Sequence, residues 1–181
     1  MLGHPLITRA LNEDDRLGTI LTVVKDSDSY IIKGRLLFPT RVKNNLITAT
    51  TIERLTWQEP LEVFDCAGEN KQLLGASNLT KEGKDIYFVV KVISEKHCND
   101  IVRVIKELGV GAFDRMYPMF PVLEIKEEHQ ICGICDNPIG KNGCEHEPGK
   151  VYLRTVCRTK VLEAKVQQLV WSGIKQFPHR F

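Results

Sequence analysis

The chain has 181 residues, 43% of them hydrophobic and 27% charged, which is typical of a folded globular protein and not of a disordered one. Lys and Arg number 25 against 23 Asp and Glu, and the resulting net charge of +2 does not favour nucleic acid or acidic lipid as a partner. No apolar run approaches the roughly 18 residues that cross a bilayer, and the first residues lack the pattern of a signal peptide.

The first half of the chain alternates short β-branched or apolar runs with polar turns, which is typical of strands. The predicted strands are 17–24, 30–38, 61–64, 73–74 and 86–93. The first two flank the polar residues 26–29 and are expected to form a hairpin. Thr50 and Glu53 have the spacing of a capping box, which predicts a short helix over 50–57.

In the second half, Ser94 is the predicted N-cap of a helix that runs to Leu108, and Gly109 is expected to end it. Apolar residues recur in this helix every three or four positions, which indicates one face packed on a core. They are Cys98, Ile101, Val102, Ile105 and Leu108. A strand is predicted over about 119–126, and an apolar segment over 161–171 closes the chain. The sum is an α+β domain with more strand than helix.

Four of the six cysteines fall between positions 132 and 157. Cys132-Gly-Ile-Cys135 is a knuckle, in which a short turn brings two thiolates to one metal, and Cys144-Glu-His146 supplies a second pair. Three thiolates and one imidazole suit tetrahedral Zn²⁺. We therefore predict a metal site formed by Cys132, Cys135, Cys144 and His146.

Cys157 is an alternative fourth ligand in place of His146, and the sequence does not choose between the two sets. Four protein ligands leave no open position on the metal, so the expected Zn²⁺ is structural. A module this short has little core, so the metal would supply much of its folding free energy. The loop over 133–147 is acidic and lacks aromatic residues, which is a poor surface for nucleic acid. The alternative is a loop of unbonded cysteines.

Other candidate chemistry is sparse. A Cys66–His97 dyad rests on residue type alone, and Cys98 is expected in the core. We expect turn positions for Asp65, Glu69 and Asp85, surface positions for His4, His129 and His179, and core or interface positions for Trp57 and Trp171. The sequence contains no phosphate loop, dinucleotide fingerprint or Gly-x-Ser-x-Gly elbow.

Residues 150–181 carry seven Lys or Arg residues against Glu163 alone, a local charge of +6. This basic end could contact nucleic acid or an acidic protein surface. The alternative, which the sequence favours, is a solvated face on a strand and a helix.

Several segments occur in a recognisable order. They are Gly34–Asn44, Leu46–Arg54, Leu73-Leu74-Gly75, Asp85–Val92 and the amphipathic helix that follows. This order resembles the bacteriophage prohead (capsid maturation) protease family. The cysteine cluster, with Glu147-Pro148-Gly149 and Tyr152 before Cys157, is similar to a zinc module of some phage members, and Leu162–Val166 matches the last core strand of the family. The similarity covers about residues 30–170.

The resemblance implies a compact β-rich fold, a small barrel or sandwich with packed helices. It does not carry the proteolytic activity over. Family members place a catalytic His before the apolar pair that matches Leu73-Leu74, and a nucleophilic Ser after the helix. Residues 65–70 contain no His and residues 109–116 contain no Ser. A serine protease needs both groups, so the resemblance implies a relative that kept the scaffold and lost the catalytic pair.

We therefore expect a non-catalytic structural or assembly protein of a phage head or neck, located in the virion or the host cytoplasm. Its expected partners are capsid, portal or other virion proteins and further copies of itself, with no membrane partner. One alternative is an active capsid maturation protease with unrecognised catalytic residues. Another is a small zinc-binding regulator that contacts nucleic acid or a host protein.

Four parts of the chain are expected. They are an N-terminal arm (1–16), a β-rich protease-like domain (17–128), a zinc-binding module (129–157), and a closing strand with a C-terminal tail (158–181). The arm and the tail carry apolar residues without a period that would bury them. We expect these ends to dock on a second copy or a phage protein. The alternative is that they fold back on their own domain.

Overall fold

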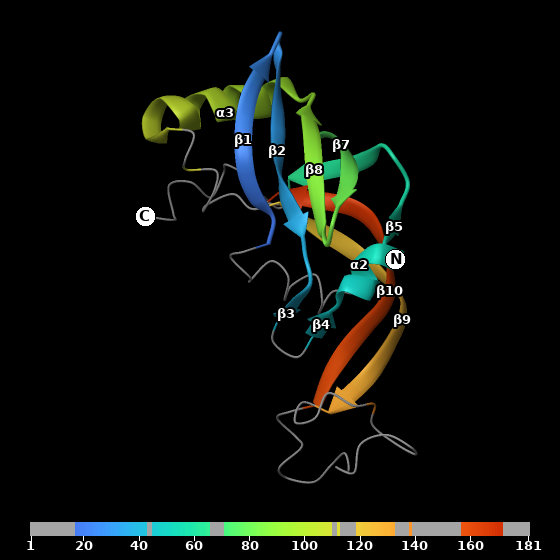
Figure 1. Cartoon of the computed structure of the whole chain (residues 1–181). Helices are drawn as coiled ribbons and strands as arrows, with labels where there is room; N and C mark the ends of the chain where they lie inside the picture. Colours follow the sequence, from blue (N-terminus) through green and yellow to red (C-terminus); the bar gives the residue numbers. More distant parts are fainter. Residues whose placement is uncertain are drawn as a thin grey trace.

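A computed structural model of the protein describes residues 17–42, 45–65, 71–109, 112, 119–132, 138 and 157–171. Within these ranges the chain forms ten strands and two helices. All ten strands belong to one sheet, which curls into a half-barrel (Figure 1). The prediction of a β-rich domain with more strand than helix is confirmed. The described strands form a single curled sheet and not two stacked sheets.

One wall of the half-barrel is an antiparallel group of four strands. In spatial order they are β1 (Thr19–Asp26), β2 (Ser29–Leu37), β8 (Asp85–Val92) and β7 (Gln72–Glu82). The first two form the predicted hairpin, whose loop holds Ser27 at a φ of 53°. Side chains alternate between the core and solvent along β2 and β8, as a half-buried sheet requires.

The other wall is organised by β10 (Cys157–Trp171). One edge of β10 pairs antiparallel with β9 (Met119–Cys132). Its other edge pairs in parallel with three short strands in turn. They are β4 (Asn45–Ile47), β5 (Thr56–Trp57) and β6 (Leu61–Asp65), and β3 (Thr40–Val42) pairs with β4. Because β6 also pairs with β7, β10 joins the two walls.

Two predicted strands are too short. The predicted strand over 73–74 is part of β7, which continues eight residues further, and the chain turns only after Glu82. β9 continues six residues beyond the predicted strand, to Cys132. Both extensions are mostly polar, so the sequence lacks a continuous apolar signal there. Pairing with β8 and β10 supplies the hydrogen bonds that keep these residues in strands.

The short helix α2 (Ala49–Arg54) is present, but its predicted cap is wrong. Thr48 is the N-cap, and Thr51 completes the capping box in place of Thr50 and Glu53. Thr51 also donates its hydroxyl proton to the carbonyl oxygen of Val161, which ties the helix to β10. This second bond explains why Thr51 is buried.

The helix α3 (Glu95–Leu108) begins and ends as predicted, with Ser94 as N-cap and Gly109 as C-cap. Its buried face consists of His97, Cys98, Ile101 and Val104. Val102 and Leu108, predicted to be part of that face, are 47% and 41% exposed. The buried row is rotated towards His97 because that side chain has a buried partner. Neither described helix is long and apolar enough to cross a membrane.

The core lies inside the curl and includes side chains from both walls and from both helices. Trp171, at the end of β10, is fully buried and confirms its predicted core position. Trp57 packs against the core from its edge and donates its indole N–H to Oε1 of Glu59. Gly34 lies where β1 closely approaches β2, and Phe88 packs on the same spot.

We predict that Gly34→Ala lowers the free energy of unfolding by about 3 kcal/mol, since overpacking a tight site has costs of this order. A Cβ atom at Gly34 would lie 2.0 Å from the carbonyl oxygen of Thr19 and 2.6 Å from Cζ of Phe88. Urea denaturation measures the change. Gly83→Ala is the control, because its Cβ meets open space and only its φ of 62° opposes Ala, at a cost of about 1 kcal/mol. Equal costs at both positions would contradict the packing described here.

Candidate functional site

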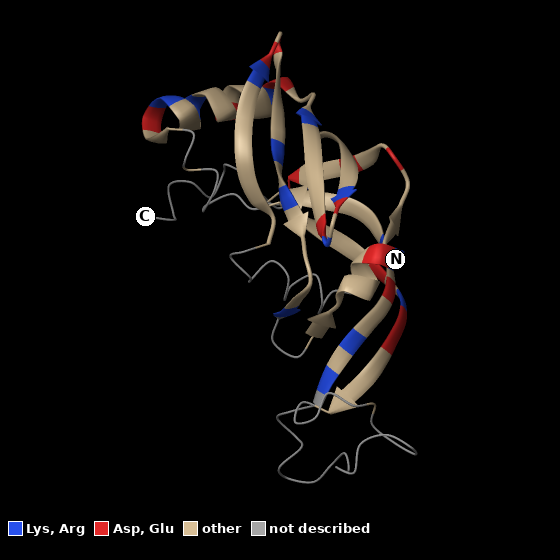
Figure 2. Ribbon diagram, in the orientation of Figure 1, with Lys and Arg blue, Asp and Glu red and all other residues tan. Residues whose placement is uncertain are grey.

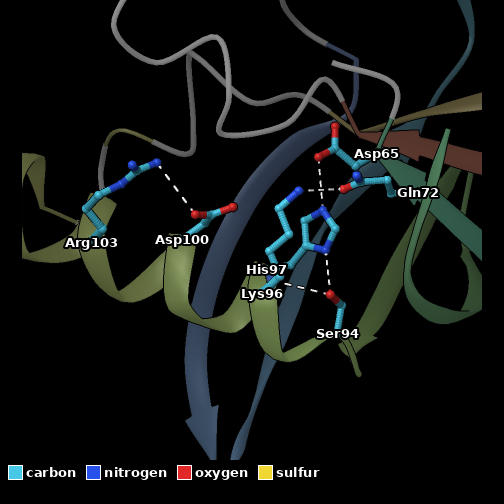
Figure 3. Close-up of polar contacts among 7 residues, drawn as sticks. All are labelled: Asp65, Gln72, Ser94, Lys96, His97, Asp100 and Arg103. Carbon is cyan, nitrogen blue, oxygen red and sulfur yellow. Dashed lines mark hydrogen bonds and ion pairs between the residues drawn. The ribbon is translucent and has the colours of Figure 1, made fainter. Parts of the chain in front are cut away.

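Three side chains form a hydrogen-bonded chain where β6 ends and α3 begins (Figure 3). Nε2 of His97 lies 3.0 Å from Oδ2 of Asp65, and Nδ1 of His97 lies 2.8 Å from Oγ of Ser94. The His97 and Asp65 side chains are 2% and 3% exposed, whereas Ser94 is half-buried. The carboxylate, the imidazole and the hydroxyl therefore stand in the order of a catalytic triad.

The prediction that Asp65 lies in a turn is wrong. Asp65 is the last residue of β6, where it pairs with Trp171 of β10. This pairing carries the carboxylate into the core, and a buried carboxylate needs a partner. His97 is that partner, although 32 positions separate the two residues. The sequence offers no signal for this contact, because it depends on how α3 crosses the end of the sheet.

The surroundings of these residues favour an anchor for α3 over a catalytic site. Oγ of Ser94 also accepts a hydrogen bond from the backbone N–H of His97, as an N-cap does. The His97 ring is enclosed, whereas a general base in acyl transfer must hand its proton to a leaving group. Together the three residues hold the first turn of α3 against the end of β6.

Two cysteines, Cys66 and Cys98, lie outside the cysteine cluster in the sequence. Cys98 is buried on α3, as predicted, and its thiol lies 3.8 Å from the carbonyl oxygen of Val92. Burial raises the pKa of this thiol above its usual value, which keeps it protonated and unreactive. Cys66 lies outside the described residues. Both ring nitrogens of His97 already have partners, which argues against a Cys66–His97 dyad.

The β9–β10 pair extends from the sheet as a two-stranded arm, whose outer end is formed by Cys132 and Cys157 (Figure 1). Cys132 and Cys157 are direct cross-strand partners at its end, and the Cys132 side chain is buried. Cys135, Cys144 and His146 lie outside the described residues. In the described part of the chain, no group of three or more His, Cys, Asp or Glu residues could hold a metal. The metal site therefore stays a prediction.

Charged side chains lie along the outer half of the β9–β10 pair (Figure 2). Residues 126–130 of β9 are exposed, and His129 among them confirms its predicted surface position. The Lys126 ammonium donates to Oε1 of Glu124 at 2.6 Å, and this hydrogen bond lowers the pKa of the Glu124 carboxyl. Charged side chains on a long outer strand discourage pairing with the strands of other molecules.

Comparison of the chain with protein-family models, with curated proteins and with solved structures finds no match.

We predict that His97→Gln lowers the free energy of unfolding by about 3 kcal/mol, because the buried Asp65 carboxylate would lose its hydrogen bond to the imidazole. Chemical denaturation measures the loss. His129→Gln is the matched control, since His129 lies 3.6 Å from Glu127 on the exposed arm and such pairs contribute about 0.5 kcal/mol or less.

A double-mutant cycle with Asp65→Asn isolates the interaction between His97 and Asp65. The two changes should cost much less together than the sum of their separate costs, because each removes the same contact. Additive costs would contradict the pairing.

Proposed function

We propose that the chain is a non-catalytic structural or assembly protein of a bacteriophage head or neck, built on a prohead-protease-like scaffold that structural zinc stabilises. The observation that carries the proposal is the use of Ser94, His97 and Asp65. In this Ser-His-Asp set the His97 and Asp65 side chains are enclosed, and the set anchors a helix. A set engaged in this way supports a scaffold role more than a protease role.

The segment that resembles the family's catalytic region also has a packing role here. Leu74 is fully buried in β7, and its carbonyl oxygen accepts hydrogen bonds from the backbone N–H groups of Ile93 and Ser94. Gly75 lies tight against β8, where a Cβ atom would come within 1.9 Å of the carbonyl oxygen of Lys91. Packing alone therefore explains why Leu74 is apolar and why position 75 is a glycine, which fits a retained scaffold.

The pairing register between β9 and β10 supports the proposed zinc site. Cys132 and Cys157 are opposite each other, so the two ends of the cysteine cluster start from neighbouring backbone positions. Directly opposite residues have Cβ atoms about 5 Å apart, a spacing that suits two ligands of one ion. This favours Cys157 as a member of the ligand set with Cys132 and Cys135, completed by Cys144 or His146.

The runner-up function is an active capsid maturation protease. The hydrogen-bonded order of Ser94, His97 and Asp65 favours this protease function, because Ser94 is only half-buried. The proposed partners are the same for both functions: capsid, portal or other virion proteins and further copies of the chain. The two functions differ in whether the capsid protein is cut.

We predict that a capsid protein co-expressed with this chain keeps its full length, because the enclosed His97 cannot serve as a general base. Intact-mass spectrometry of the capsid protein measures the result in a protease-deficient host. Shortening that requires the chain, and that Ser94→Ala abolishes without unfolding the protein, would establish the protease instead. Ser77→Ala is the control, because Ser77 is a buried serine of β7 outside the cluster.

We predict one Zn²⁺ per chain in native mass spectrometry and its loss in Cys132→Ser. Hydrogen exchange should then show lost protection at the outer ends of β9 and β10, while β1, β2 and β8 stay protected. Cys66→Ser is the control: Cys66 lies outside the cysteine cluster in the sequence, so this variant should keep the metal. Zinc retained in Cys132→Ser, or protection lost equally throughout the sheet, would contradict the proposed module.

A further inference from the structure

The outer face of the β1–β2–β8–β7 wall is apolar at a place where it meets solvent. Leu21 on β1 is 60% exposed and Val89 on β8 is 38% exposed. Both line a shallow groove of about 350 Å³, together with Lys33, Tyr87 and Thr80. The groove runs across neighbouring strands, since Lys33 is the cross-strand partner of both Thr22 and Val89. Exposed apolar surface with this continuity is typical of a surface that another segment covers.

Cations border the groove. Lys33 belongs to its lining, and Lys91 lies two residues further along β8 on the same face. Neither has an ion-pair partner among the residues that the structure describes. Arg35, on the same face of β2, lies 3.8 Å from Asp85 and is partly neutralised. Glu82 also lines the groove, at the end of β7. The free cations therefore lie towards β2 and the middle of β8, so an occupant should combine apolar and acidic side chains.

The chain carries a segment of that chemistry immediately before β1. Residues 1–16 contain Leu2, Leu6, Ile7 and Leu11, followed by the acidic run Glu13-Asp14-Asp15, and with Arg9 and Arg16 the segment has a net charge of −1. The chain enters the described structure at Leu17, four residues before Leu21. Sixteen residues reach up to about 50 Å when extended, and four strands span only about 15 Å. The segment is therefore attached beside the groove and long enough to cross it.

We propose that residues 1–16 cover the groove of their own chain, with the aliphatic side chains on Leu21 and Val89 and the acidic run near Lys33 and Lys91. Attachment beside the groove gives the segment an effective concentration on the order of millimolar, which favours its own chain over a second copy. In this position residues 1–16 remove the apolar surface of the groove from solvent. Contacts between copies of the chain would then use other surfaces of the molecule.

Photocrosslinking tests this placement. The full-length chain carries p-benzoyl-phenylalanine in place of Leu21 and, as the control, in place of Val102, which is 47% exposed on α3. After irradiation, peptide mass spectrometry should find residues 1–16 joined to position 21 but not to position 102. Mixing isotope-labelled and unlabelled chains should give joined peptides of one label only. Mixed labels would mean that a second copy supplies the segment, and crosslinks to other segments would mean a different occupant. Either result overturns the proposal.

Charge reversal tests the polar half of the contact. Changing Glu13, Asp14 and Asp15 to Lys should lower the crosslinking yield by roughly fivefold or more, given about 0.5 kcal/mol for each exposed ion pair. Lys33→Glu with Lys91→Glu should lower it similarly, and the combined variant should restore it. All these residues are on the surface or in the N-terminal segment, so circular dichroism should stay unchanged. A crosslinking yield that is unchanged in both charge-reversal variants overturns the proposed electrostatic contact.

Discussion

Hydrogen bonding of β10 along both of its edges is the interaction on which the rest of the structure depends. One edge holds β9 in an antiparallel pair over almost its whole length. The other edge receives β4, β5 and β6 in parallel, and these strands lie between residues 45 and 65, about 100 positions earlier in the chain. Because β10 is the last described strand, the two walls cannot join until the residues up to Trp171 are present. Pairing between such distant segments is entropically costly and is expected to make folding slow.

The same strand connects the core with the cysteine cluster. Its C-terminal end places Trp171 in the core opposite Met119, and its N-terminal end places Cys157 opposite Cys132. Buried apolar contacts therefore stabilise one end of the β9–β10 pair, whereas the exposed residues 126–130 separate Ile131 and Cys132 from that core. A metal at the outer end would fix the register where apolar packing is sparse, which gives structural zinc a physical reason in this fold.

Local chemistry in the sequence predicted the elements whose signals are local. The hairpin at Ser27, the strand at β8 and the helix capped by Ser94 and Gly109 depend on turn residues, β-branched residues and caps close to one another in the chain. The polar parts of β7 and β9 could not be predicted, since only pairing with other strands makes them extended. Asp65 was misplaced for the same reason, because its environment is created by β10 and α3. Of the predicted metal ligands, the structure describes only Cys132 and Cys157, which are cross-strand partners. This pairing joins residues 25 positions apart, so local sequence could not predict it.

An account of this chain as a scaffold in a phage particle is tested most directly by the composition of purified particles. Quantitative mass spectrometry of phage particles purified from cells that express the chain would measure its copy number relative to the capsid and portal proteins. The account predicts that the chain is present, uncut, at a fixed ratio to one of these proteins. A chain that is found only in immature particles and disappears as the capsid protein is shortened would contradict the account and would indicate a maturation protease.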